Sequence, residues 1–232
     1  MALPANQLRI MPSSCCQGVD EFFTYRVASR ELRRYRLKGP VASSRKLIGA
    51  LLSEGVTGRT LLDIGGGIGA IQHELLHAGA AFAVSVDASV EYLRVAQQEA
   101  IRLGNRLRTT LHHGDFVDLA DKVDSADIVA LDRVLCCYAD AENLIKASAA
   151  KARQLYGLVY PRKSVLSYLS IVFFNGFMRL TRNKFRTFYH HPNKIHDLVT
   201  ALGLSKVYSA NTLLWHIAVY KHASVLPDEP QS

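Results

Sequence analysis

Short apolar runs alternate with segments of helical periodicity from Thr60 onward. The strand-like runs are TLLDI, AFAVSVD, LRTTLHHGD, ADIVALD and QLYGLVYP, and the helix-like segments include IQHELLHAGA, SVEYLRVAQQEAIRLG and LCCYADAENLIKASAAKA. Strands that alternate with helices pair in parallel. After a further helix-like segment, NKIHDLVTALG, two runs separated by Asn211, LSKVYSA and TLLWHIAVYKH, resemble an antiparallel hairpin. The pattern therefore predicts an α/β fold with a sheet that is mixed at one edge.

The chain before this alternation reads as two helices that break near Gly39-Pro40. We therefore expect a helical extension or lid over residues 1–58, an α/β domain over residues 59–223, and a disordered tail over residues 224–232. The longest apolar stretch, Val165 to Met178, is shorter than the roughly 20 residues that a membrane-spanning helix needs. It is expected to be a helix that is buried or lies on a surface.

The stretch TLLDIGGGIGA combines a buried strand with a cluster of glycines. Gly65, Gly67 and Ala70 fit the spacing of a dinucleotide-binding loop, in which a pyrophosphate lies at a helix N-terminus. However, Asp63 lies two residues before Gly65. A carboxylate repels a pyrophosphate, whereas it gains a charge-assisted hydrogen bond from the ammonium group of a methionine-type ligand. The sequence thus favours S-adenosylmethionine over a dinucleotide.

Two further acids follow the next two strands. Asp87 lies about 20 residues beyond the glycines, where a carboxylate can bind ribose hydroxyls. Asp115 can accept a hydrogen bond from an adenine amino group, and Phe116 can cover the ring. Each residue also has a purely structural interpretation: Asp63 and Asp87 as caps, and Phe116 as part of the core.

The motifs LLDIGGGIG, VSVDAS, GDF and ADIVALDRV resemble those of the class I S-adenosylmethionine-dependent methyltransferases, over roughly Thr60 to His222. The resemblance implies a Rossmann-like, doubly wound mixed sheet of about seven strands with an antiparallel C-terminal hairpin. It also implies that Asp63 and the glycines contact the methionine part, Asp87 the ribose, and Asp115 with Phe116 the adenine, while Asp132 lies at the methyl-transfer site. The full set of implied cofactor-binding residues is Asp63, Gly65, Gly66, Gly67, Gly69, Asp87, Ala88, Asp115, Phe116, Asp132 and Arg133.

Residues 143–196 contain no acid, and their basic residues account for all of the formal net charge of +8: Lys146, Lys151, Arg153, Arg162, Lys163, Arg179, Arg182, Lys184, Arg186 and Lys194. Methyltransferases of this class often insert an acceptor-binding element here, which we expect at about residues 162–191. An apolar pocket with a cationic rim suits a small hydrophobic acceptor that carries a carboxylate or phosphate, with O-methylation favoured. A solvated basic face and peripheral contact with an anionic membrane remain open. Nucleic acid is disfavoured, because LDRVL lacks the signatures of enzymes that methylate bases.

Three residues are candidates for catalysis: Tyr138, His190 and His191. A neutral histidine in the run FYHHP could take a proton from a hydroxyl or phenol. A carboxylate acceptor would need no base, and the histidines would then bind substrate. This segment loosely resembles magnesium-protoporphyrin O-methyltransferases, whose acceptor is a propionate on a large flat ring.

The four cysteines form two adjacent pairs, Cys15-Cys16 and Cys136-Cys137, and MALPANQLRI lacks the apolar stretch of a secretion signal. Both features indicate a reducing, cytoplasmic location. Converging thiols could bind a soft metal or metalloid, but adjacent cysteines suit zinc poorly, so we expect small buried hydrophobes and no metal. The alternative functions are a non-catalytic cofactor- or membrane-binding module and methylation of a metalloid or RNA.

Overall fold

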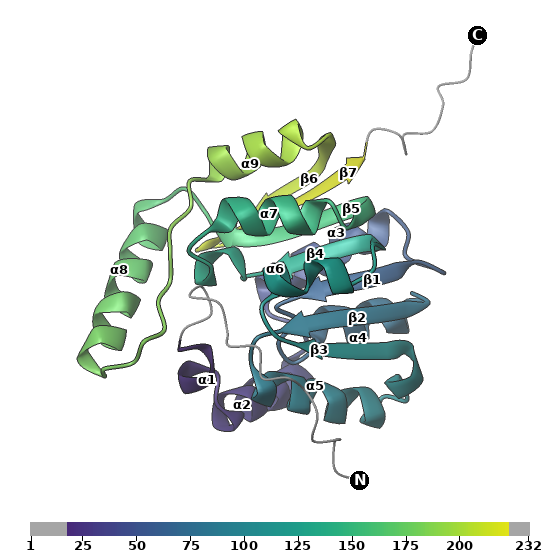
Figure 1. The fold of residues 1–232 in the computed structure, drawn as a ribbon, viewed down its shortest axis with the longest axis horizontal. Helices are drawn as coiled ribbons and strands as arrows, with labels where there is room; N and C mark the ends of the chain where they lie inside the picture. The colour runs from purple at the N-terminus through teal and green to yellow at the C-terminus, as the bar shows by residue number, and fades with distance from the viewer. Residues whose placement is uncertain (1–17, 223–232) are drawn as a thin grey trace.

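A single seven-stranded sheet organises the described part of the chain, residues 18–222 of a computed structural model (Figure 1). Its order is β3-β2-β1-β4-β5-β7-β6. The strands β1 to β5 pair in parallel, while β7 runs antiparallel between β5 and β6. This confirms the predicted doubly wound mixed sheet with a C-terminal hairpin. The strands are β1 (Thr60–Ile64), β2 (Phe82–Asp87), β3 (Thr109–His113), β4 (Ala126–Asp132), β5 (Ala152–Pro161), β6 (Leu204–Asn211) and β7 (Trp215–His222).

Helices cover both faces of the sheet, which explains why the central strands are apolar without alternation. One core cluster lies beneath α6 (Phe116–Leu119), α7 (Ala141–Ala149) and α9 (Pro192–Ala201). A second cluster lies on the opposite face, beneath α3 (Ala42–Ser53) and α4 (Ala70–His77). The helix α5 (Val90–Arg102) packs beside β3 and β2, at one end of the sheet (Figure 1).

The N-terminal helices divide into two groups. The helix α3 packs directly on the sheet through Leu47 and Leu51, and a Cβ on Gly157 of β5 would lie 2.8 Å from Leu47 Cδ1, so this close packing requires glycine. By contrast, α1 (Val19–Phe22) and α2 (Tyr25–Lys38) lie beside the site described below. The predicted break near Gly39-Pro40 is confirmed, because α2 ends at Lys38.

One predicted helix begins later than the sequence pattern indicated. Leu135–Cys137 form a short 3₁₀ turn, η4, and α7 begins only at Ala141. Asp140 caps α7 by accepting a hydrogen bond from the backbone N–H of Asn143 (3.1 Å). Because this cap fixes the helix start, the two cysteines lie in a turn instead of on a helix.

The apolar stretch near Val165 forms a helix, α8 (Val165–Leu180), at the outer edge of the molecule (Figure 1). Most of its apolar side chains are exposed, so it lies on the surface. Within residues 18–222, no helix has the length and apolarity to cross a membrane. Cys15-Cys16 and the predicted tail over residues 224–232 lie outside the described residues.

The strand order reverses direction between β1 and β4. From β1 the chain moves outward through β2 to β3, and then it returns to β4 on the other side of β1. At such a switch point the connections leave in opposite directions, so a crevice forms outside the carboxyl ends of the strands. This edge of the sheet is therefore where a ligand is expected.

A buried ionic cluster fastens α2 to α5. The side chain of Glu99 is fully buried, and it accepts hydrogen bonds from Arg36 Nη2 of α2 (2.5 Å) and Arg102 Nη2 (2.6 Å). Burial alone would raise the pKa of Glu99, but the hydrogen bonds from the two arginines outweigh it and lower this pKa to about 2. The cluster therefore holds α2 in place beside the site.

We expect Glu99→Gln to lower the free energy of unfolding by about 1–3 kcal/mol at pH 7, because two half-exposed arginines lose their charged partner. The folded pKa lies below the ordinary value of 4.5, so this stabilisation is present above that pH and is lost as the pH falls toward about 2. Urea unfolding of both proteins across this range measures it. The control Glu142→Gln removes the exposed Glu142–Lys146 pair and should change stability little. A difference that persists unchanged at about pH 2 would contradict this role of Glu99.

Candidate active site

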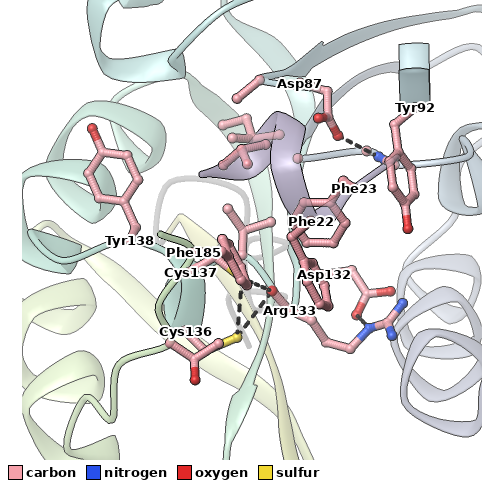
Figure 2. A pocket seen from close by; sticks show the side chains of 18 of the residues that line it. Phe22, Phe23, Asp87, Tyr92, Asp132, Arg133, Cys136, Cys137, Tyr138 and Phe185 are labelled. Carbon is pink, nitrogen blue, oxygen red and sulfur yellow. Dashed lines mark hydrogen bonds and ion pairs between the residues drawn. The ribbon is translucent and has the colours of Figure 1, made fainter. Parts of the chain in front are cut away.

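A cavity of about 540 Å³ lies at the carboxyl ends of β1, β2 and β4. Its walls come from the glycine loop, from α1 and α2, from the turn after β4, and from α8 with the segment that follows it (Figure 2). This volume is within the range of about 300–1,000 Å³ that is typical of small-molecule sites. The cavity thus joins the predicted cofactor motifs to the predicted acceptor-binding insert.

Asp63 at the end of β1 is only 1% exposed. Burial raises its pKa well above the ordinary value, and the negative charges of Asp132 and Asp87 raise it further, while the backbone N–H of Gln72 acts in the opposite direction. Within residues 18–222, no donor forms a hydrogen bond of normal geometry with either carboxylate oxygen. The ionised form of a buried carboxyl group that lacks such donors is stabilised by a cationic ligand.

The glycine loop brings the backbone close to Asp63. Gly65 and Gly67 have positive φ values of 63° and 57°. A Cβ on Gly66 would collide with Ser85 Oγ and with the carboxylate of Asp63. Gly69, the N-cap residue of α4, also has a positive φ, of 80°, but unlike the other three glycines it does not line the cavity. Positive φ values therefore explain Gly65, Gly67 and Gly69, close packing explains Gly66, and all but Gly69 line the cavity.

Asp87 at the end of β2 links the loop to the next strand. Its carboxylate accepts a hydrogen bond from the backbone N–H of Gly67 at 2.8 Å (Figure 2), and a second from the backbone N–H of Ser89, also at 2.8 Å. Burial raises the pKa of Asp87, and these two N–H donors partly offset that rise. Ser89, not Asp87, is the N-cap residue of α5. Because each oxygen has further acceptor capacity, Asp87 can also accept from ligand hydroxyls.

Asp115 and Phe116, at the end of β3, line the same cavity. Asp115 caps α6 by accepting from the backbone N–H of Val117 (2.9 Å). The hydroxyl of Tyr138 donates to this carboxylate, with both oxygens at 3.0 Å. Tyr138 is buried and lines the cavity, but its hydroxyl is held by an acid. The structure therefore places Tyr138 at the predicted adenine end of the site.

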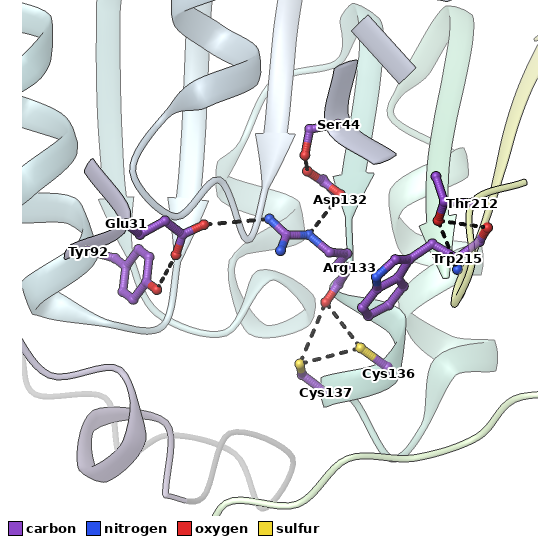
Figure 3. A network of polar contacts seen from close by, with 9 residues as sticks. All are labelled: Glu31, Ser44, Tyr92, Asp132, Arg133, Cys136, Cys137, Thr212 and Trp215. Atoms are coloured by element: carbon purple, nitrogen blue, oxygen red, sulfur yellow. Dashed lines mark hydrogen bonds and ion pairs between the residues drawn. The ribbon is translucent and has the colours of Figure 1, made fainter. Parts of the chain in front are cut away.

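A polar network connects the end of β4 with α2 (Figure 3). Asp132 accepts hydrogen bonds from Ser44 and from Arg133 Nε (3.2 Å). Arg133 also forms an ion pair with Glu31 of α2 (3.6 Å between Nη2 and Oε1), and Glu31 accepts a hydrogen bond from the Tyr92 hydroxyl (2.6 Å). Because Glu31 lines the cavity too, this network links the N-terminal helices to the wall of the site.

Sequence reasoning missed Glu31, Ser44 and Tyr92. The signal for Glu31 was present, since it is the single acid within the otherwise basic helix α2. Tyr92 and Ser44 carried no comparable signal, because each lies on a helix face that is also part of the core.

The adjacent cysteines lie in η4 beside Arg133. Both thiols donate toward the carbonyl oxygen of Arg133, at 3.2 Å from Cys136 and 3.6 Å from Cys137, and the two sulfurs are 3.7 Å apart (Figure 2). Hydrogen bonding with Cys136, together with burial, raises the pKa of Cys137 well above its ordinary value. A neutral thiol is a poor metal ligand. Residues 18–222 contain no group of three or more histidine, cysteine or acidic side chains that could hold a metal.

Aromatic and aliphatic side chains form the rest of the cavity. The rings of Phe22 and Phe185 are stacked, with centroids 4.9 Å apart and planes at 9°, and Phe174 of α8 contacts Phe22 edge-on at 5.4 Å. Ile171 of α8 and Trp215 of β7 complete this apolar end. We call this part of the lining the apolar end, and the part formed by the acids at the carboxyl ends of the strands the acidic end. Their proximity could not be predicted from local sequence patterns, because these side chains come from three segments far apart in the chain.

The two predicted histidines do not line the cavity. His190 Nε2 donates to the carbonyl oxygen of Tyr138 (2.8 Å), and burial lowers its pKa. The backbone N–H of Phe188 donates to the carbonyl oxygen of Cys136 (2.7 Å), so this segment is tied to η4 at two points. His191 is exposed and stands at the N-cap position of α9. His190 therefore positions the turn that carries the cysteines and Tyr138.

The predicted cationic rim is smaller than the sequence indicated. None of the ten basic residues of segment 143–196 lines the cavity. The positive charge in the cavity lining comes from Arg133, which lies outside that segment. Lys146, Lys151 and Arg153 lie near the start of β5, at the opposite end of the strands. The predicted parallel sheet already implies this position for these three residues, because residues just before a parallel strand lie at the edge opposite its carboxyl end.

Residues 61–155 match a family model described as a methyltransferase domain. No curated protein matches the chain. Among solved structures, magnesium protoporphyrin IX methyltransferase from Synechocystis, with bound S-adenosylhomocysteine (SAH), is similar with a TM-score of 0.70 and 21% identity, covering 88% of this chain and 98% of that one.

Two further structures share the fold. An O-methyltransferase family 2 protein from Planctomyces limnophilus, in complex with apigenin, has a TM-score of 0.58 and 18% identity, covering 79% of this chain and 63% of that one. A putative RNA methyltransferase from Pyrococcus horikoshii has a TM-score of 0.55 and 13% identity, covering 82% and 86%. Residues 61–155 are thus similar to a methyltransferase domain, and the chain shares the fold of these solved methyltransferase structures.

Proposed function

We propose that the protein transfers the methyl group of S-adenosylmethionine to an oxygen atom of a small, hydrophobic acceptor that carries an anionic group. One observation carries this proposal: a single cavity is lined both by carboxylates at the strand ends and by aromatic side chains from α1, α8 and the segment after α8. The cofactor is cationic at its sulfonium and ammonium groups, so it suits the acidic end. The acceptor then occupies the apolar end.

The cofactor fits the unsatisfied groups of the acidic end. In the proposed complex, the ammonium group of the methionine part donates to the buried carboxylate of Asp63, and the backbone of Gly65, Gly66 and Gly67 borders the same part. This contact removes the cost of an ionised acid that has no protein donor of normal geometry within the described chain. A diphosphate in the same place would be repelled by Asp63, Asp87 and Asp132.

The remaining cofactor contacts follow from the ends of β2 and β3. We assign the ribose to Asp87, with Ala88 beside it, because the carboxylate is fixed by two backbone donors and still has lone pairs available. We assign the adenine to Asp115 and Phe116, both of which line the cavity. Asp132 and Arg133 then border the methyl-transfer region, where the polar network holds their side chains in place.

The apolar end suits an acceptor with a ring or chain of hydrophobic surface. Phe22, Phe174 and Phe185 provide a wall of rings, and Ile171 and Trp215 add to it. Closing such a site excludes water, and binding of both reactants holds the attacking atom in line with the methyl carbon; both effects favour displacement. The names of two similar structures include a porphyrin and the flavonoid apigenin, which are hydrophobic ring compounds of this kind.

The anionic group has two candidate partners at the margin of the cavity. Arg162 follows the lining residue Pro161, and Arg186 stands between the lining residues Phe185 and Thr187. Their guanidinium groups donate to backbone carbonyls, Arg162 to Thr212 (3.2 Å) and Arg186 to Asn183 (2.5 Å). Neither forms an ion pair with an acid among residues 18–222. Each can therefore attract an anion.

Asp63→Asn tests the cofactor assignment through two opposite effects. Because the pKa of Asp63 is raised, its negative charge destabilises the ligand-free fold increasingly as the pH rises above the ordinary value of 3.8. The variant should therefore be more stable than the parent protein at pH 7, and equally stable well below pH 3.8. The same change should weaken S-adenosylmethionine binding by about 1.5–3 kcal/mol. Thermal unfolding and titration calorimetry measure these effects.

The control for this experiment is Asp127→Asn. Asp127 accepts two hydrogen bonds from Thr60 (2.8 and 2.9 Å) and lies outside the cavity lining. Its loss should lower stability and leave cofactor affinity unchanged. Unchanged affinity in Asp63→Asn, measured beside this control, would reject the assignment of the methionine part to Asp63.

A panel of acceptors tests the acceptor class. Hydrophobic carboxylic acids and phenols, each paired with its neutral amide or methyl ether, are incubated with methyl-deuterated S-adenosylmethionine and followed by mass spectrometry. We expect label in the acids or phenols and none in their neutral partners. Ile171→Trp should abolish transfer while cofactor affinity is retained, because it fills the apolar end alone. Label on carbon, or equal transfer to the neutral partners, would overturn the proposal.

Separate variants test the predicted histidines. Because neither lines the cavity, we expect His191→Gln to retain turnover, and His190→Gln to retain it as well, since glutamine can still donate to the carbonyl oxygen of Tyr138. His190→Ala should lower turnover, because the turn with Tyr138 loses its fixed position. Measurement of kcat against pH is decisive: a histidine-like inflection that disappears in His190→Gln would instead identify this residue as a general base.

A further inference from the structure

The outward side of α8 is apolar along its whole length. Val165 is 75% exposed, Phe173 is 74% exposed, and Leu180 is 82% exposed. These side chains recur at helical spacing, so they share one side of the helix. We define the outer face of α8 as its exposed large apolar residues, Val165, Leu166, Tyr168, Leu169, Val172, Phe173, Phe177 and Leu180.

The inward side of α8 is more polar than this outer face. Ser167 Oγ donates to the carbonyl oxygen of Leu214 (2.9 Å). Asn175 donates to the carbonyl oxygen of Thr187 (2.7 Å) and accepts from the backbone N–H of the same residue (2.9 Å). A helix on the surface of a globular protein has the opposite polarity, with apolar residues inward and polar residues outward. The inner contacts thus hold α8 with its apolar face outward.

Basic residues flank the outer face at both ends. Arg162 and Lys163 precede α8, and Arg179, Arg182 and Lys184 lie at or beyond its last turn. Residues 143–196 contain no acid, and Glu21 of α1 accepts a hydrogen bond from the backbone N–H of Lys184 at 3.3 Å. An apolar helix face bordered by cations is typical of helices that lie in the interface of an anionic membrane.

We propose that the outer face of α8 docks on an anionic lipid bilayer. The helix has 16 residues, so it lies along the membrane surface and does not cross it. In this orientation the apolar side chains enter the region between headgroups and acyl chains, while the flanking cations contact lipid phosphates. A second copy of the chain fits less well, because a two-fold contact through this face would bring the like-charged ends of two helices together.

This inference goes beyond the proposed function and does not depend on it. Ile171 and Phe174 project from the other side of the same helix into the cavity. Docking through the outer face therefore places the apolar end of the cavity one helix away from the bilayer. A hydrophobic acceptor dissolved in lipid would have a short route to the site.

Sedimentation with vesicles tests the proposal on the full chain. One set of vesicles is phosphatidylcholine alone, and the other is an equal mixture with phosphatidylglycerol. We expect binding to the anionic vesicles, at least about tenfold weaker binding to the neutral ones, and loss of binding at high salt. Equal binding to both sets, or binding to neither, would overturn the proposal.

Matched variants assign the binding to α8. The double variant Phe173→Glu and Phe177→Glu should reduce vesicle binding at least about tenfold. The control is Leu107→Glu, because Leu107 is also apolar and 91% exposed but lies in the 3₁₀ turn Arg106–Arg108. This control should not reduce vesicle binding. Circular dichroism and calorimetry with S-adenosylmethionine should show that both variants fold and bind cofactor, which separates this result from a failure of the proposed function. Light scattering that shows a dimer lost in the double variant, without vesicle binding by the parent, would assign the face to a second copy instead.

Discussion

The site depends on a carboxylate that the protein itself does not neutralise. Asp63 is buried at the end of β1, near the charges of Asp132 and Asp87, and the glycine loop closes over it. Isolated negative charge in an apolar interior costs several kcal/mol unless a cation or donors compensate it. The carboxyl group of Asp63 is therefore stable in its ionised form only when a cationic ligand is bound. Under the proposed function, this buried charge lowers the stability of the ligand-free chain and gives the site selectivity for a positively charged cofactor.

The fold provides the rigidity that this electrostatic arrangement requires. Parallel strands deliver Asp63, Asp87 and Asp132 to one edge of the sheet, and helices on both faces hold the strands in register. The contacts that hold the helix α2 include the buried cluster around Glu99 and the pair between Glu31 and Arg133. Glu99 does not line the cavity, whereas Glu31 and Arg133 do, so α2 is held both away from the site and at its wall.

Much of the acidic half of the site could be predicted from the sequence. Asp63 and Asp87 could be placed because each ends a short apolar run, and a parallel sheet brings all such ends to one edge. The apolar half could not be placed in this way. Phe22, Phe185 and Trp215 meet only because α1, the segment after α8 and β7 converge, and no local pattern encodes that convergence.

The same limit affected the prediction of a cationic rim around the cavity. A run of basic residues is visible in the sequence, but which of them reach the rim of the cavity depends on where each helix ends. The two histidines illustrate a further limit, because loop residues near a site in sequence can serve to hold the loop.

The stack of Phe22 on Phe185 joins two segments that otherwise belong to separate parts of the chain. Phe22 comes from α1, while Phe185 follows α8, and both rings line the cavity. Separating these rings would widen the entrance to both halves of the site at once, so exchange of the spent nucleoside and admission of the next acceptor would share a single gate. The frequency with which two aromatic rings part would then set an upper limit on the rate of turnover, however fast the chemical step is.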